Sequence, residues 1–121
     1  MCWPRRARPR RPKLRRPKPL RPDLAHNRVE IDGRVVYHDA LRHTPGGLPS
    51  LQLRLAHASE QTEAGRPRPV ECELEAQAFG KPAQELAGVP AGAQVRLIGF
   101  LERKGVRDRW PIVHVTEYEL I

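Results

Sequence analysis

The sequence predicts an all-β protein, in which residues 27–121 form a small five-stranded barrel and residues 1–26 form a disordered basic arm. Three observations lead to this fold class. Apolar residues occupy every second position in five segments, which is the pattern of half-buried strands. Loops rich in glycine and proline separate the segments, and only residues 83–87 have room for a helical turn. Five strands with almost no helix in so short a chain indicate a closed or nearly closed barrel.

The arm carries the whole charge excess of the chain. Residues 1–26 hold ten Lys/Arg and one acid, a net +9, whereas residues 27–121 hold twelve Lys/Arg and thirteen acids, a net −1, and together these give +8. Six prolines in residues 1–22 and repulsion among like charges predict disorder with polyproline II character. Such an arm would add non-specific phosphate contacts. The alternative is that the natural protein starts later, for instance at Leu24, without this arm.

The first strand is predicted over residues 29–37, where Val29, Ile31, Val35 and Tyr37 alternate with polar residues. Gly33 in its middle predicts a bulge or sharp bend, which a barrel strand needs at a corner. After a loop at 44–49, the second strand is predicted at 51–57, with leucines at every second position.

Residues 60–69 are polar and contain a glycine and two prolines, so they predict a long hairpin loop. The third strand follows at 70–78, with three glutamates on one face: Glu71, Glu73 and Glu75. A glycine- and proline-rich spacer at 80–92 precedes the fourth strand at 95–101. A charged loop around Gly105 then leads to the last strand, at 110–120. An SH3-like barrel is the architectural alternative, but the long second loop and the spacer favour an OB-fold barrel.

Catalysis is not expected. The five histidines show neither an H-E-x-x-H motif nor metal-ligand spacing, and Cys2 and Cys72 are too far apart for a C-x-x-C pair. The glutamates of the third strand are explained better by a solvated face than by paired catalytic carboxylates. No apolar run is long enough for a membrane span, and no apolar stretch follows the basic N-terminus as in a secretory signal. We therefore expect no catalytic residue, metal or cofactor, and a cytoplasmic protein with free thiols.

Binding of single strands without sequence preference needs cations that follow the phosphates and aromatic faces that stack bases. The best cluster of cations lies in the loop between the last two strands, one of two loops that line an OB groove: Arg103, Lys104, Arg107 and Arg109. Trp110 after this loop and Tyr37 at the end of the first strand are the candidates for stacking. The alternatives are a solvated turn that Glu102 and Asp108 partly neutralise, and a Trp110 that caps the barrel.

Short motifs in a specific order resemble the family of primosomal replication protein N (PriB). They are Asn27-Arg28-Val29, Gly47-Leu48-Pro49, the segment from Leu51 to His57, Glu63-Ala64-Gly65, the strand of Cys72, Gly99-Phe100-Leu101 and the segment from His114 to Ile121. PriB is a bacterial OB-fold homodimer related to single-stranded DNA-binding protein (SSB). The resemblance spans residues 27–121 and implies a homodimer that binds single-stranded DNA. It also implies two protein partners in the bacterial cytoplasm, near the nucleoid: the PriA helicase and a further primosome loading protein. Arg42 joins the candidate site because the family carries a cation there.

Two departures from the family predict weaker or differently placed DNA binding. Glu71 stands where better-known members have a DNA-contacting aromatic residue, and the charged loop is shorter. Two alternatives therefore stay open: an OB-fold protein-interaction module with little intrinsic DNA binding, or a short SSB-like protein. The salt dependence of binding distinguishes the protein-interaction module from a DNA-binding protein, because phosphate contacts weaken steeply with salt and apolar edge contacts do not. Two further aromatic residues are expected elsewhere, Phe79 beneath the spacer and Phe100 in the core or a dimer interface.

Overall fold

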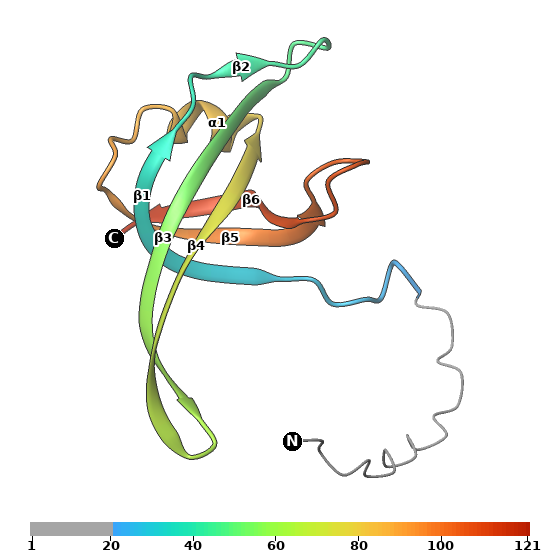
Figure 1. Cartoon of the computed structure of the whole chain (residues 1–121). Helices are drawn as coiled ribbons and strands as arrows, with labels where there is room; N and C mark the ends of the chain where they lie inside the picture. The colour runs from blue at the N-terminus through green and yellow to red at the C-terminus, as the bar shows by residue number, and fades with distance from the viewer. Residues whose placement is uncertain (1–20) are drawn as a thin grey trace, which may run out of the picture.

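The computed structural model of the chain describes residues 21–121, so most of the predicted arm lies outside the described residues. The described part is built of strands and one short helix (Figure 1). In chain order these are β1 (Val29–His38), β2 (Arg42–His43), β3 (Pro49–Glu63), β4 (Arg66–Phe79), α1 (Lys81–Leu86), β5 (Gln94–Arg103) and β6 (Pro111–Leu120). Within residues 21–121 no helix is long and apolar enough to cross a membrane.

The strands form one sheet that closes on itself. Its order is β1-β5-β6-β4-β3-β2, and β1 also pairs with β3, so five strands make a barrel with the short β2 attached to the edge of β3. All pairs are antiparallel except β4 and β6, which run parallel where residues 76–78 meet residues 113–115. This is the OB arrangement, so the predicted fold class is confirmed and the SH3-like alternative is wrong.

Strand β1 changes partner half-way along its length. It pairs with β5 from Val29 to Arg34 and with β3 from Arg34 to His38. Gly33 lies at this corner, where a Cβ atom would sit 2.5 Å from the carbonyl oxygen of Ala56. The bulge predicted at Gly33 instead falls between Val35 and Tyr37, and the glycine is required because β3 approaches too closely for a side chain.

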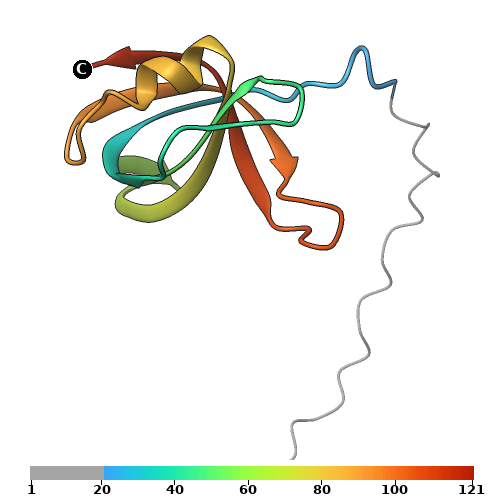
Figure 2. The same ribbon diagram turned by 90° about the horizontal axis from the view of Figure 1, so that it is seen from above.

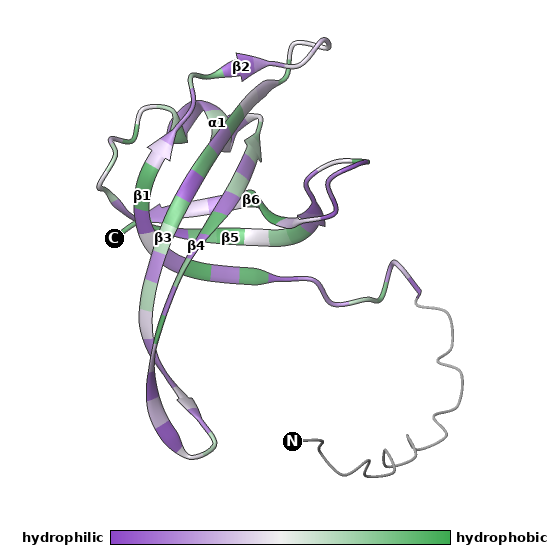
Figure 3. Ribbon diagram, in the orientation of Figure 1, coloured by the Kyte–Doolittle hydropathy of each residue, from purple (hydrophilic) through white to green (hydrophobic). Residues whose placement is uncertain are grey.

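The long hairpin loop predicted at residues 60–69 is wrong. Strands β3 and β4 stay paired as far as Glu63 and Arg66, and a two-residue turn joins them. Ala64 and Gly65 both have positive φ, 52° and 75°, as a type I′ turn requires. The result is a ribbon that projects from the barrel (Figure 1). Its two faces are largely hydrophilic towards the tip (Figure 3), so no apolar alternation marks it in the sequence.

The core lies inside the barrel and draws on every long strand. The buried apolar side chains are Val35, Leu51, Leu53, Leu55, Ala76, Ala78, Val95, Leu97, Val113 and Val115. The predicted helical turn is α1, whose Ala83 and Leu86 are buried in the same cluster. Two elements extend away from this core in both views (Figures 1 and 2), the N-terminal segment before β1 and the loop between β5 and β6.

Candidate nucleic-acid interface

A shallow recess on the outer face of the barrel brings together side chains from β1, β3, β4, β6 and the β5–β6 loop. It has a volume of about 90 Å³ and is lined by Tyr37, Gln52, Leu53, Glu75, Ala76, Lys104 and Ile112. A second recess, lined by Asp39, Ala40, Arg42, Ser50 and Gln52, shares Gln52 with the first. The two recesses adjoin at Gln52 and together are called the groove, with Arg42 lining one recess and Tyr37 and Lys104 lining the other.

Tyr37 faces this groove because of the bulge in β1. Val35 lies in the core opposite Leu55, and strict alternation would point Tyr37 into the core as well. The register shift between the two residues reverses this direction, so that Tyr37 lies opposite Arg54 and is 47% exposed. The guanidinium carbon of Arg54 is 5.9 Å from the centroid of the tyrosine ring, within cation–π range. A cation therefore lies over a tyrosine ring that stays partly exposed.

Hydrogen bonds within its own backbone hold the conformation of the β5–β6 loop. Lys104 N–H donates to the carbonyl of Trp110 at 2.8 Å, and Gly105 N–H donates to the carbonyl of Asp108 at 3.0 Å. The Asp108 carboxylate accepts from Trp110 N–H at 3.0 Å, so this acid also has a structural role in the turn. Trp110 is 74% exposed, which rules out the alternative that it caps the barrel.

The predicted cations differ in whether an acidic side chain already pairs with them. Arg42, Arg103, Arg107 and Arg109 are exposed and make no ion pair within residues 21–121. Lys104 instead turns to the groove floor, where its Nζ lies 2.8 Å from Oε2 of Glu75. This contact lowers the pKa of the Glu75 carboxyl and raises the pKa of the Lys104 amine. Four of the five predicted cations are thus available to a ligand, and one is already paired.

Arg54 and Glu75 are groove residues that the sequence did not reveal. Arg54 Nη2 lies 3.2 Å from Oε1 of Glu75, and its Nη1 lies 3.6 Å from a carboxylate oxygen of Glu73. The Nε of Arg54 is buried without a hydrogen-bond partner. The only sequence signal was that Arg54 stands between two core leucines of β3, which places it on the outer face. Its pairing with β4 depends on the register of the two strands, which that pattern does not contain.

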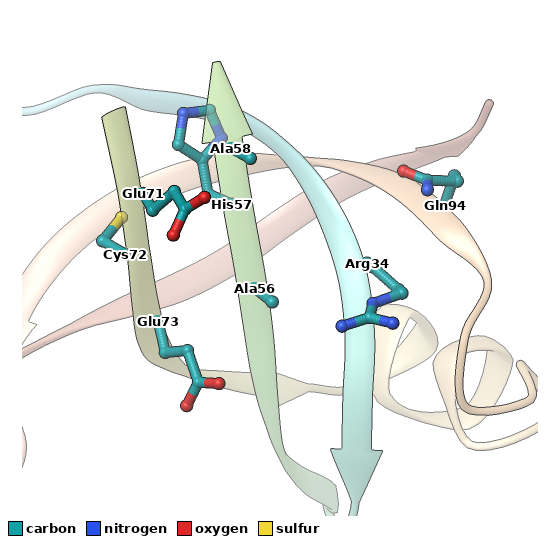
Figure 4. A pocket seen from close by; sticks show the side chains of 8 residues that line it. All are labelled: Arg34, Ala56, His57, Ala58, Glu71, Cys72, Glu73 and Gln94. Atoms are coloured by element: carbon teal, nitrogen blue, oxygen red, sulfur yellow. The ribbon is translucent and has the colours of Figure 1, made fainter. Parts of the chain in front are cut away.

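Glu71 lies away from this groove. It lines a broad open recess of about 670 Å³ together with Arg34, Ala56, His57, Ala58, Cys72, Glu73 and Gln94 (Figure 4). His57 has a structural role there, because its Nδ1 lies 2.6 Å from the carbonyl oxygen of Asp32 and its Nε2 lies 2.7 Å from the hydroxyl of Ser59. In the described part of the chain no group of three or more His, Cys, Asp or Glu side chains could hold a metal ion.

A row of aromatic side chains continues the outer face beyond the groove. The rings of Phe100 and His114 are stacked, with centroids 5.2 Å apart, and Phe79 lies on the other side of His114 at 5.9 Å. Both phenylalanines are exposed, so neither the expected packing of Phe79 beneath the spacer nor a core position for Phe100 is correct. The row extends across β4, β6 and β5, because Gln77 pairs with His114 and His114 pairs with Phe100.

Comparison with known proteins assigns the family. A family model described as "another single-strand binding protein family" matches residues 27–117. Replication restart protein PriB of Bordetella pertussis is 48% identical over 75 residues, which cover 62% of this chain and 70% of that protein. The chain belongs to the PriB family.

Solved structures agree with the PriB assignment and with the barrel. PriB of Ralstonia solanacearum matches at a TM-score of 0.74 and 30% identity, over 79% of this chain and 98% of that one. A single-stranded DNA-binding protein from Thermus aquaticus matches at a TM-score of 0.65 and 25% identity, over 79% of this chain and 50% of that one. The resemblance found in the sequence is confirmed, and the PriB barrel of this chain shares its architecture with SSB proteins. By name, these relatives are replication-restart and single-stranded DNA-binding proteins.

Proposed function

We propose that this PriB-family chain binds single-stranded DNA in the groove between β2 and the β5–β6 loop and acts in the replication-restart primosome. The observation that carries the proposal is the exposed ring of Tyr37 in a recess that the β5–β6 loop lines through Lys104 and that adjoins a recess lined by Arg42. Phosphates would contact Arg42 on one side and Arg103, Arg107 and Arg109 on the other, while bases stack on Tyr37 and Trp110. Such binding requires no catalytic group, metal or cofactor.

In the primosome the chain would stimulate the PriA helicase and help to reload the replication machinery through a further loading protein. This role follows from family membership, since the relatives are named replication restart proteins. It would place the chain in the bacterial cytoplasm, near the nucleoid.

A homodimer is part of the same proposal. From Val29 to Gly33, β1 pairs with β5 on one edge only, because its pairing with β3 begins at Arg34. An uncovered strand edge is a place where a second copy can add hydrogen bonds. Light scattering coupled to size exclusion gives the mass, and a mass of one chain at micromolar concentration would exclude the dimer.

The alternative function is an OB module that docks proteins and binds DNA weakly. It is favoured by the near-neutral charge of residues 27–121 and by Glu73 and Glu75, which neutralise the groove floor. The two functions differ in their salt dependence, since phosphate contacts release counterions and apolar contacts do not.

Fluorescence anisotropy with a labelled oligo-dT and the full chain tests the DNA-binding proposal. R103A with R107A should weaken binding and flatten the slope of log affinity against log salt by about 1.4, since each lost contact to a single strand removes about 0.7. R28A with K81A is the matched control, because it removes the same charge from exposed positions outside the groove. Equal losses in the two double variants would remove the loop from the site.

A further inference from the structure

A single carboxylate on the floor of the groove holds two cations from different parts of the fold. Glu75 of β4 contacts Lys104 of the β5–β6 loop at 2.8 Å and Arg54 of β3 at 3.2 Å. The two contacts use different oxygens, so one carboxylate bridges the guanidinium and the amine. Two cations that converge on one anion make the geometry of an anion-binding site, and here a side chain of the protein itself is the anion.

This site lies where a bound strand would run. Glu75 and Lys104 line the same recess as Tyr37, and the guanidinium of Arg54 lies over the tyrosine ring. A phosphate held by Arg54 would therefore sit next to the surface on which its own or a neighbouring base stacks. The side chains of Arg54, Lys104 and Glu75 are 37%, 37% and 35% exposed, so an incoming phosphate can reach both cations.

We propose that Arg54 and Lys104 form a phosphate subsite of the groove, which Glu75 occupies in the free protein as an internal competitor. The proposal rests on the DNA-binding function proposed above and assigns an affinity-lowering role to one residue within that site. A strand that enters the subsite must displace the carboxylate, and the displaced Glu75 then lies close to a phosphate of the same sign. Glu75 thus lowers the affinity of the groove for single strands without contributing a contact of its own.

A phosphate can displace Glu75 from its contacts with Arg54 and Lys104. Ion pairs between partly exposed side chains are individually weak, because water and salt compete for both partners. Glu73 contributes a second, longer contact to Arg54 at 3.6 Å, so the guanidinium keeps one acidic partner when Glu75 moves away. The lowered pKa of the Glu75 carboxyl keeps it charged at neutral pH, where it competes fully.

A double-mutant cycle in the full chain tests the proposal, with oligo-dT anisotropy across a salt series as the readout. E75Q should bind roughly three- to tenfold more tightly than the wild type at moderate salt, with a salt slope steeper by about 0.7–1.4 for one or two recovered contacts. K104A should cost several-fold more affinity in the E75Q background than in the wild-type background, because only there is the amine free. E75A should change the affinity in the same direction as E75Q.

E117Q is the matched control. It makes the same change of charge on an exposed residue of β6 that lines no part of the groove and has no ion pair within residues 21–121. Its affinity should stay within about twofold of the wild type, and thermal melting of each variant confirms that it is folded.

Three results would overturn the inference. Weaker binding by E75Q and E75A would mean that the carboxylate orders the site instead of blocking it. A gain no larger than that of E117Q would mean that no subsite is released, and an equal effect of K104A in both backgrounds would mean that Lys104 is not masked. These outcomes leave the proposed function standing if the wild type binds, whereas a wild type and an E75Q variant that both fail to bind contradict both proposals.

Discussion

Asp32 shows what a single carboxylate contributes at the scale of one residue. It accepts two hydrogen bonds from Arg96 of the neighbouring β5, at 2.6 and 3.0 Å, and this bidentate contact lowers the pKa of the Asp32 carboxyl. Because the pKa is lower in the folded chain than in the unfolded chain, the contact stabilises the fold at neutral pH. This contribution is lost as the pH falls below the ordinary range of an aspartate, towards the lowered pKa.

The lowered pKa of the Asp32 carboxyl determines how the effect of D32N on the free energy of unfolding should depend on pH. The wild type should have a higher free energy of unfolding than D32N at pH 7, and the difference should shrink steadily between pH 5 and pH 2. Urea unfolding at a series of pH values measures it. A difference that stays constant over this range would show that the asparagine changes packing and not charge.

At the scale of elements, two glycines allow strands to approach one another more closely than side chains permit. Gly99 of β5 is the extreme case, because a Cβ atom there would lie 1.7 Å from the carbonyl oxygen of His114 in β6. The register of β5 and β6 shifts at the same point, between Ile98 and Gly99. The close contact and the irregularity thus fall at the same place in the pairing of β5 with β6.

Gly99→Ala should therefore destabilise the barrel by more than about 3 kcal/mol, since the clash is with backbone and no side chain can move aside. Gly105→Ala, with no atom within 4 Å of the added methyl group, is the control and should stay within about 0.5 kcal/mol of the wild type. Chemical unfolding of both variants makes the comparison. Equal stability of the two would mean that β5 and β6 shift apart freely.

The elements that alternation predicted are those with one face in the core. Alternation predicts β1, β5, β6 and the inner parts of β3 and β4, because in each of them core residues such as Leu51, Leu53 and Leu55 alternate with polar residues. The outer half of the β3–β4 ribbon was missed because both of its faces meet water, and the short Ala64-Gly65 turn was hidden among polar residues.

The candidate site was predictable to a similar extent. The loop cations and Trp110 lie close together in the chain, within residues 103–110, and can be recognised together, whereas the cluster of Arg54, Glu75 and Lys104 joins three segments and depends on strand register. Tyr37 is accessible, as its predicted role in base stacking requires, although the bulge that exposes it lies where alternation gives no signal.

At the scale of the whole molecule, charge is divided unequally. Residues 1–26 carry a net +9 and residues 27–121 a net −1, so a nucleic acid would meet a basic segment joined to a nearly neutral barrel. Under the proposed function, the N-terminal segment would supply long-range attraction and the groove would supply short-range contacts.

Removal of residues 1–26 separates these contributions. The shortened chain should still bind oligo-dT at low salt, with lower affinity and a flatter salt slope than the full chain, because the charges of the segment release counterions on binding. Anisotropy of both chains across a salt series is the measurement, and circular dichroism checks that the shortened chain is folded. If only the full chain binds, the barrel is better explained as a protein-docking module.

The β3–β4 ribbon has one further consequence, for self-association. Pro67 and Pro69 are partners of Thr62 and Glu60, at positions where the β4 backbone nitrogens face away from β3. These two nitrogens carry no hydrogen, so a third strand finds no donor at these two positions of the β4 edge, near the tip of the ribbon. Growth of a sheet into a fibril needs both edges of every unit. The missing donors at Pro67 and Pro69 therefore oppose such growth at the tip of the ribbon.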